Sequence, residues 1–138
     1  MEQFFTTLDR KQADTYSPLA LAFVGDAVYE EFVRTKVLLL ANTSANKLHK
    51  KAVAFVKASA QSKAMQALLP HLSPEEEAVF KRGRNAHSGS VPKNADVTEY
   101  RAATGFEALM GYLFLIGETS RLYELMEMSY SLLAESIL

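Results

Sequence analysis

Residues 97–116 constrain the fold of this chain more than any other segment. The stretch VTEYRAATGFEALMGYLFLI contains no proline and carries apolar or small side chains on almost every side of a helix. A helix of this kind must be covered by other elements in a globular protein. The longest apolar runs of the chain are far shorter than the ~20 residues that span a bilayer. We therefore expect a central helix that other helices surround.

Helix-start signals predict the surrounding helices. Ser17 and Ser73 are each followed by proline, which places a capping hydroxyl and a suitable first-turn residue at a helix N-terminus. The stretch 87–96 contains glycine and proline and is expected to be a loop. No segment has the pattern of a strand, so we predict an all-α helical bundle. Hydrophobic spacing places its helices at 18–40, 46–69, 74–86, 97–116 and 119–138.

Length and composition indicate one domain in a reducing compartment. A chain of 138 residues fits a single core, so 1–138 is predicted to be one domain. The chain has no cysteine, which excludes disulfides and thiolate metal sites, and its first residues lack the pattern of an export signal. We expect a soluble cytoplasmic protein. The absence of HExxH, Gly-x-Ser-x-Gly and P-loop motifs argues against the enzyme classes that use them.

Positive charge is concentrated in the middle of the chain, although the whole chain has a net charge of only −1. Residues 44–101 hold 10 Lys/Arg and 5 Asp/Glu, whereas residues 1–43 hold 4 and 6 and residues 102–138 hold 1 and 5. The net charges of these segments are therefore +5, −2 and −4. Such a basic region indicates a surface for a polyanion, and an ordinary solvated helix surface is the alternative.

The basic side chains form two groups that suit a nucleic-acid backbone. The segment FKRGRNAHSGSVPKNADVTEYR mixes cations with amides and hydroxyls, the groups that contact phosphate and sugar oxygens. A second group lies on the predicted helix 46–69. The candidate RNA-binding residues are Lys81, Arg82, Arg84, Asn85, Lys93 and Arg101 in the first group and Lys47, Lys50 and Lys51 in the second.

Two carboxylates occur in segments that are otherwise apolar, Asp26 in AFVGDAVYE and Glu107 in ATGFEALMGYLFL. Each follows a glycine, Gly25 or Gly105, and because a helical glycine costs about 1 kcal/mol relative to alanine, these glycines indicate close backbone approach. If the two helices cross there, both carboxylates come within reach of one divalent cation, and oxygen ligands suit Mg²⁺. Alternatively, each acid lies on an exposed stripe or pairs with a base such as Arg101. Spacing alone does not separate these interpretations.

The motifs LAFVGDAVYE, FKRGRNAHS and PKNADVTEYRAATGFEALMGYLFL together resemble those of Mini-III ribonucleases. These enzymes are small bacterial members of the ribonuclease III family that have the catalytic domain without the double-stranded RNA-binding domain. The resemblance spans nearly the whole chain, approximately residues 15–135. It implies an all-α endonuclease that acts as a homodimer and cleaves double-stranded RNA with Mg²⁺, or with Mn²⁺ as a substitute, to leave 5′-phosphate and 3′-hydroxyl ends.

The resemblance also implies roles for individual residues. The metal-binding Asp and Glu of the family fall on Asp26 and Glu107, which are therefore the candidate catalytic and metal-binding residues. In the family an aromatic residue at the position of Phe23 packs into the second subunit. The implied substrate is precursor 23S ribosomal RNA, processed at its paired termini, with a ribosomal protein as a candidate assistant.

The chain departs from the family pattern at two positions. Most ribonuclease III enzymes have a Glu four residues before the first metal-binding acid and an Asp three residues before the second, where this chain has Ala22 and Thr104. Glu30, one turn after Asp26, is a candidate substitute. These departures leave open a catalytically inactive RNA-binding relative. A third interpretation is a helical protein-interaction module in which Asp26 and Glu107 are ordinary ion-pair partners, and the basic middle region argues against it.

Overall fold

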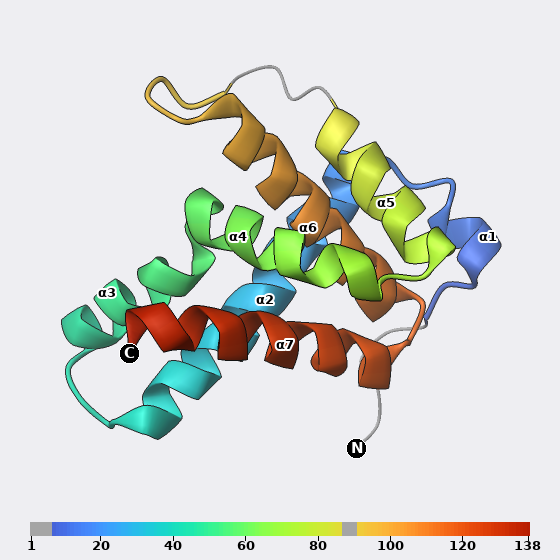
Figure 1. Cartoon of the computed structure of the whole chain (residues 1–138). Helices are drawn as coiled ribbons and strands as arrows, with labels where there is room; N and C mark the ends of the chain where they lie inside the picture. The colour runs from blue at the N-terminus through green and yellow to red at the C-terminus, as the bar shows by residue number, and fades with distance from the viewer. Residues whose placement is uncertain (1–6, 87–90) are drawn as a thin grey trace.

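A computed structural model describes residues 7–86 and 91–138, and within these ranges every regular element is a helix (Figure 1). The prediction of an all-α fold is confirmed. Residues 87–90 of the predicted loop 87–96 lie outside the described residues. No helix of the described ranges is long and apolar enough to cross a membrane. The elements are α1 (Arg10–Ala13), α2 (Pro18–Leu40), α3 (Ala45–Val56), α4 (Ala58–Leu68), the 3₁₀ turn η1 (Leu69–His71), α5 (Pro74–Asn85), α6 (Val97–Leu115) and α7 (Thr119–Ile137).

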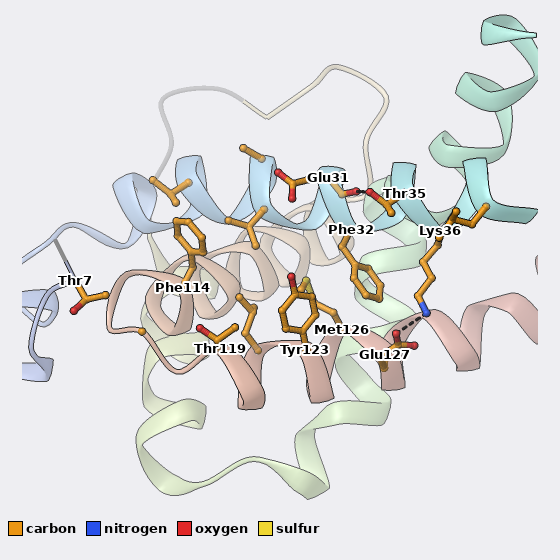
Figure 2. A pocket seen from close by; sticks show the side chains of 16 residues that line it. Thr7, Glu31, Phe32, Thr35, Lys36, Phe114, Thr119, Tyr123, Met126 and Glu127 are labelled. Carbon is orange, nitrogen blue, oxygen red and sulfur yellow. Dashed lines mark hydrogen bonds and ion pairs between the residues drawn. The ribbon is translucent and has the colours of Figure 1, made fainter. Parts of the chain in front are cut away.

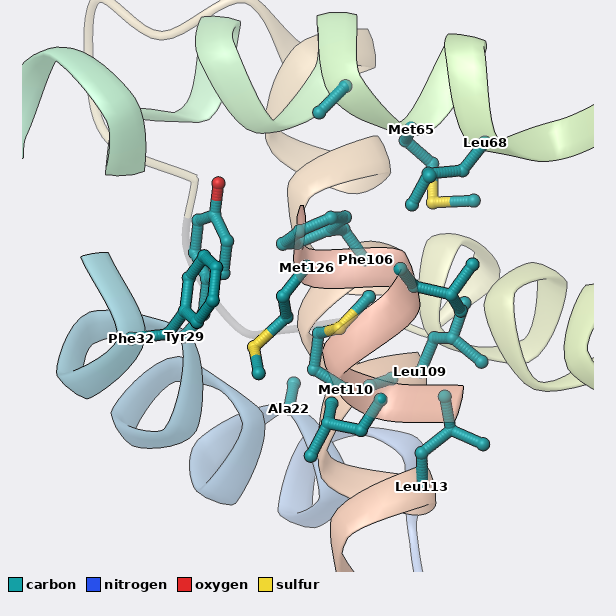
Figure 3. Close-up of a cluster of buried hydrophobic side chains, with 14 of the residues drawn as sticks. Ala22, Tyr29, Phe32, Met65, Leu68, Phe106, Leu109, Met110, Leu113 and Met126 are labelled. Atoms are coloured by element: carbon teal, nitrogen blue, oxygen red, sulfur yellow. The ribbon is translucent and has the colours of Figure 1, made fainter. Parts of the chain in front are cut away.

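Helix α6 occupies the centre, as the segment 97–116 predicts. It crosses α2 and also packs against α4, α5 and α7 (Figure 1). Full burial of one large apolar side chain contributes about 1.5–3 kcal/mol, so a helix buried on several faces holds its neighbours together. The buried side chains of α6 include Phe106, Leu109, Met110 and Leu113. They share one core (Figure 3) with side chains of α2, α4 and α7, among them Tyr29, Phe32, Met65, Leu68 and Met126.

Two glycines allow α2 and α6 to touch through their backbones. A Cβ atom built on Gly25 would lie 1.7 Å from the carbonyl oxygen of Glu107, and one built on Gly111 would lie 1.9 Å from the carbonyl oxygen of Leu21. Both neighbours are backbone atoms of packed helices, which cannot move aside as a flexible side chain can. The predicted close approach at Gly25 is therefore confirmed.

The glycine of α6 that meets α2 is Gly111, and the predicted pairing of Gly25 with Gly105 is wrong. Gly105 faces α5, because a Cβ atom built on it would lie 2.7 Å from the carbonyl oxygen of Phe80, and one built on Gly83 would lie 2.9 Å from the Gly105 Cα atom. Positions 105 and 111 are six residues apart, about 240° around a helix. They therefore serve crossings with two different helices.

The predicted single helix over 46–69 is also wrong, because the chain breaks at Lys57. This residue has an extended backbone (φ −62°, ψ 156°), so α3 ends at Val56 and α4 begins at Ala58. The sequence has no glycine or proline at this point to mark the break. The side-chain amide of Gln61 donates a hydrogen bond of 3.0 Å to the carbonyl of Val56. The break lets α4 change direction and lie against α6, a requirement of tertiary packing that local spacing does not show.

Arg121 joins the start of α5 to α7. Its guanidinium donates to both carboxylate oxygens of Glu76, at 2.8 and 2.9 Å, and to the carbonyl of His71 at 2.7 Å. Glu76 also accepts the backbone N–H of Ser73 in a capping box, as the Ser-Pro signal at this helix start favours. The hydrogen bonds from Arg121 lower the pKa of Glu76, which keeps this bidentate ion pair charged.

Candidate functional site

Asp26 of α2 and Glu107 of α6 lie together where these two helices cross. Gly25 lies directly against the backbone of Glu107, so the close approach carries both carboxylates to one place. Asp26 is close enough to Glu107 to raise the pKa of its carboxyl. Asp26 is exposed to solvent, whereas Glu107 is partly buried. The structure therefore forms the acidic pair that the sequence left as one of two alternatives.

Glu107 is in an environment that opposes its ionisation. The pKa of Glu107 is raised to about 8, chiefly by burial and also by the neighbouring Asp26 and the charge of Glu30, whereas a hydrogen bond from Gln61 acts in the opposite direction. Two acids at one place repel each other when both are charged, so one of them binds a proton near neutral pH. A bound cation would offset the same repulsion.

The pair has the ligand chemistry of a magnesium site. Among the described residues, the ion pairs formed by basic side chains involve neither Asp26 nor Glu107. In these same ranges no group of three or more His, Cys, Asp or Glu side chains is placed to hold a metal. Mg²⁺ usually binds one or two carboxylates and completes its shell with waters and substrate phosphates. The two carboxylates fit that preference, and they do not fit an all-protein cage for Ca²⁺ or a structural Zn²⁺ site.

The buried amide of Gln61 also reaches this site, and no pattern in the sequence predicts it. Gln61 of α4 is 2% exposed, and its Nε2 donates to Glu107 Oε2 across 3.4 Å. Glutamine in a surface helix is usually exposed, so spacing gave no signal for this residue. The burial of Gln61 depends on the break at Lys57, which turns α4 toward α6.

Comparisons with known proteins identify the family. Residues 19–118 match the ribonuclease III domain family. The chain belongs to the ribonuclease III family. A Mini-ribonuclease 3 of Clostridium tetani is 49% identical over 133 residues, which cover 96% of this chain and 86% of that protein. A Mini-ribonuclease 3 of Enterococcus faecalis is 54% identical over 109 residues, which cover 78% of this chain and 83% of that protein.

The fold of the chain is shared with a solved structure. The crystal structure of a protein from Fusobacterium nucleatum superposes with a TM-score of 0.77 and 29% sequence identity, and the match covers 85% of this chain and 93% of that one. The resemblance to Mini-III ribonucleases inferred from the motifs is thus confirmed, and with it the assignment to an endoribonuclease family. The matched segment 19–118 contains Asp26, Gln61 and Glu107.

Neither departure from the ribonuclease III pattern is filled by an equivalent acid. Ala22 is a buried part of the core (Figure 3), and the hydroxyl of Thr104 donates to the carbonyl of Tyr100 at 3.1 Å. Glu30 is close enough for its charge to raise the pKa of Glu107. However, Glu30 also accepts a hydrogen bond of 2.9 Å from Arg34. Its role as a substitute ligand stays a prediction.

The first group of candidate RNA-binding residues lies where α5 ends and α6 begins. These two helix ends lie at the same end of the molecule in Figure 1. Arg82 is 3.5 Å from Asp14, Lys81 is 2.9 Å from Glu77, and the Arg84 guanidinium stands 5.6 Å from the ring centroid of Phe80. The exposed members of the group are Lys81, Arg82, Asn85, Lys93 and Arg101. Their role in binding RNA stays a prediction.

The second basic group is separate from the first. Its three lysines, Lys47, Lys50 and Lys51, are exposed on α3. Figure 1 shows α3 well apart from the end of α5 in this view. The two groups therefore belong to different parts of the helical bundle. Each is a candidate contact for a different stretch of RNA backbone.

Phe23 is 81% exposed on α2, which is unusual for a large apolar side chain. An adjacent groove of 860 Å³ runs between α2 and α7 and is lined by residues that include Phe32, Leu39, Phe114 and Met126. Figure 2 shows these two helices facing each other across the groove, which is bounded at one end by the ion pair of Lys36 with Glu127. Exposed apolar surface of this kind commonly marks an interface.

Neutralising Glu107 is expected to change how stability depends on pH. In metal-free buffer the raised pKa, about 8, means that protonated Glu107 favours the folded state at acidic pH. This contribution is lost as the pH rises from the pKa of Glu107 in the unfolded chain, about 4.3, toward its pKa in the folded protein. Glu107→Gln removes that loss. We expect its advantage over wild type in free energy of unfolding to grow by roughly 2 kcal/mol between pH 5 and pH 8, a value discounted for solvent screening.

Urea unfolding with a chelator at the two pH values measures this difference. Glu135→Gln is the matched control, because Glu135 is an exposed acid of α7. The control should follow wild type. The same pH dependence in wild type and Glu107→Gln would show that the environment of Glu107 does not favour its protonated form.

Proposed function

We propose that this protein is a Mg²⁺-dependent endoribonuclease that cleaves double-stranded RNA to 5′-phosphate and 3′-hydroxyl ends. The observation that carries the proposal is the convergence of Asp26 and Glu107 at one helix crossing in a chain of the ribonuclease III family. Their carboxylates are not ion-paired to a basic side chain of the described residues. An acidic pair that is strained without a cation is a fitting site for one.

Asp26 and Glu107 would hold the ion, and each has a distinct part. Asp26 is exposed, so it is open to the RNA backbone and to solvent, whereas Glu107 is partly buried and fixed on the central helix. When bound, Mg²⁺ activates a water molecule and offsets charge on the scissile phosphate and the leaving 3′ oxygen. Mn²⁺ prefers similar oxygen ligands and is the expected substitute. No separate protein base is required.

Specificity for duplex RNA would come from backbone shape and charge. Proteins recognise double-stranded RNA mainly through phosphates and 2′-hydroxyls, because its deep major groove is closed to side chains. The cations at the end of α5 and the start of α6, with those of α3, are the candidates for this contact. Because the grip is mainly electrostatic, we expect the affinity for RNA to fall steeply with salt.

We also propose that the protein acts as a homodimer. Phe23 and the apolar groove both involve α2, so one surface can supply a projecting side chain and a cavity to a second copy, as a two-fold symmetric interface requires. Insertion of Phe23 into the partner's groove would cover apolar surface on both copies. It would also present two acidic sites to one RNA duplex.

Precursor 23S ribosomal RNA is the proposed physiological substrate, with a ribosomal protein as a candidate assistant. The support for this substrate is the family resemblance, since the basic groups of this chain contact backbone and carry no information about sequence. The paired termini of such a precursor would present the duplex that the proposed activity needs.

Substitution of either acid is expected to abolish cleavage while the fold is kept. Asp26→Asn and Glu107→Gln should each lower the rate of duplex cleavage in Mg²⁺ by at least about 100-fold, because metal-ion catalysis supplies several kcal/mol. Their melting temperatures should be equal to or above that of wild type, since acid repulsion is relieved. The assay uses a labelled RNA duplex, with Glu135→Gln as the control and chelator as the metal-free reference.

The same assay separates the proposal from its alternative. Ala22 and Thr104 stand where most family members have acids, and this favours an RNA-binding relative without catalysis as the second candidate function. Binding of duplex RNA by wild type without any cleavage would support that candidate. Cleavage that continues in chelator would contradict the Mg²⁺ mechanism.

Removal of two cations at the end of α5 should weaken RNA binding and reduce its salt dependence. Loss of two phosphate contacts in Arg82→Ala with Arg84→Ala lowers the slope of log affinity against log salt by up to about 2. Binding of a catalytically blocked protein to duplex RNA at several salt concentrations measures this slope. Lys11→Ala with Lys63→Ala removes the same charge elsewhere and is the control. An unchanged slope in the arginine variant would remove this segment from the RNA surface.

The dimer proposal predicts that a charge at Phe23 separates the subunits. Phe23→Glu would bury a carboxylate in the partner's apolar groove, at a cost of several kcal/mol, so we expect a monomer by analytical ultracentrifugation. The side chain is exposed in one subunit, so helix content should not change. Tyr16→Glu, at another exposed aromatic, should stay dimeric. A monomeric wild type, or a dimeric Phe23→Glu variant, would contradict the proposed interface.

A further inference from the structure

Gln61 is a polar residue that is buried beside the acidic pair. It is 2% exposed, and its side-chain Oε1 is buried without a hydrogen-bond partner among the described residues. A buried polar atom that lacks a partner costs about 1–3 kcal/mol, a cost that an apolar side chain of similar size would avoid. The unpartnered oxygen of this amide therefore lowers the stability of the core. The role of Gln61 depends on the groups that its NH₂ end contacts.

The break between α3 and α4 fixes the orientation of this amide. Val56 is the last residue of α3, and its carbonyl accepts the Gln61 Nε2 at 3.0 Å. A carbonyl can only accept, so the NH₂ end of the amide must face Val56. The same NH₂ group is 3.4 Å from Glu107 Oε2, which places a donor at the carboxylate. The helix break thus decides that Glu107 meets an N–H group and not a carbonyl oxygen.

We propose that Gln61 is a positioning residue of the metal site, which holds Glu107 by one carboxylate oxygen so that the other is available to the cation beside Asp26. The inference rests on the proposed function. Groups that hydrogen-bond to metal ligands orient them, and their loss typically lowers metal affinity by about 10–100-fold. Asp26 is exposed on the other side of the pair, so Glu107 is the ligand that requires an internal support. α4 supplies this support through a single side chain.

A structural role is the competing explanation, because Gln61 also ties the end of α3 to α4. That role predicts a loss of stability when the amide is removed, with metal binding changed only as far as folding is lost. The positioning role predicts weaker metal binding without a loss of stability. Gln61→Met keeps the length of the side chain and removes both donors, and it also removes the unpartnered oxygen, so its melting temperature in chelator should equal or exceed that of wild type.

The test measures Mn²⁺ affinity in the absence of RNA. The purified protein is titrated with Mn²⁺, and binding is measured by the loss of the electron paramagnetic resonance signal of the free ion. Gln61→Met should bind Mn²⁺ at least about 10-fold more weakly than wild type. In cleavage assays the Mg²⁺ concentration for half-maximal activity should rise by a similar factor, while kcat at saturating Mg²⁺ and the KM for RNA change less. Gln66→Met, an exposed position of the same helix, is the control.

A second variant of Gln61 keeps the outcome decisive. Gln61→Asn retains the amide but is too short to contact both Val56 and Glu107, so it should also weaken Mn²⁺ binding, and it serves as the test if Gln61→Met does not fold. Mn²⁺ affinity at the wild-type level in Gln61→Met, or in Gln61→Asn as its substitute, would overturn the role of Gln61.

Glu107→Gln in the same titration separates this inference from the proposed function. If Glu107→Gln loses Mn²⁺ binding and Gln61→Met keeps it, only the role of Gln61 is wrong. If Glu107→Gln binds Mn²⁺ as wild type does, the metal site itself is wrong, and the role of Gln61 fails with it.

Discussion

The backbone contact between α2 and α6 is the constraint on which the rest of the structure depends. Gly25 and Gly111 leave no room for a Cβ atom on either helix. Inserting even one methyl group into such a contact typically costs about 1–3 kcal/mol, since helices that are packed on other faces cannot separate freely. The contact has a functional consequence, because Asp26 follows Gly25 directly, and Gly111 is one turn after Glu107. The same glycines that join the helices therefore join the carboxylates.

The site is placed at a cost to the fold of the metal-free protein. Glu107 is drawn into an apolar helix and set beside a second acid, and both effects raise its pKa. The surrounding helices tolerate this arrangement because α6 is anchored elsewhere, by its core with α4 and by the crossing of Gly83 with Gly105. Instability confined to a functional pair within a well-packed frame is typical of sites that await a ligand. The proposed cation would relieve it.

Much of this architecture follows from local sequence signals, and the exceptions share one cause. The Ser-Pro pairs gave the starts of α2 and α5, and the apolar stretch 97–116 gave the central helix. Position 111 lies on the same face as Glu107, so helical periodicity contained the correct glycine, but the choice between Gly105 and Gly111 depends on which helix meets which face. The break at Lys57 and the burial of Gln61 depend on tertiary contacts, and no residue type announces them. Likewise α1, a four-residue helix capped by Asp9, is too short for periodicity to reveal.

The acidic pair itself shows how far sequence reasoning extends. Spacing could place Asp26 and Glu107 on apolar helices, yet it left exposed acids and ion pairs as open alternatives. The geometry brings the two carboxylates to one helix crossing, and the comparisons assign the chain to an endoribonuclease family. The role of the pair as a metal site is the proposal that joins these two findings. The most direct test of the account is anomalous X-ray scattering from crystals grown with Mn²⁺. The account predicts a peak in contact with the carboxylates of both Asp26 and Glu107. Crystals of cleavage-active protein in which these carboxylates contact each other and no Mn²⁺ peak lies beside them would contradict it.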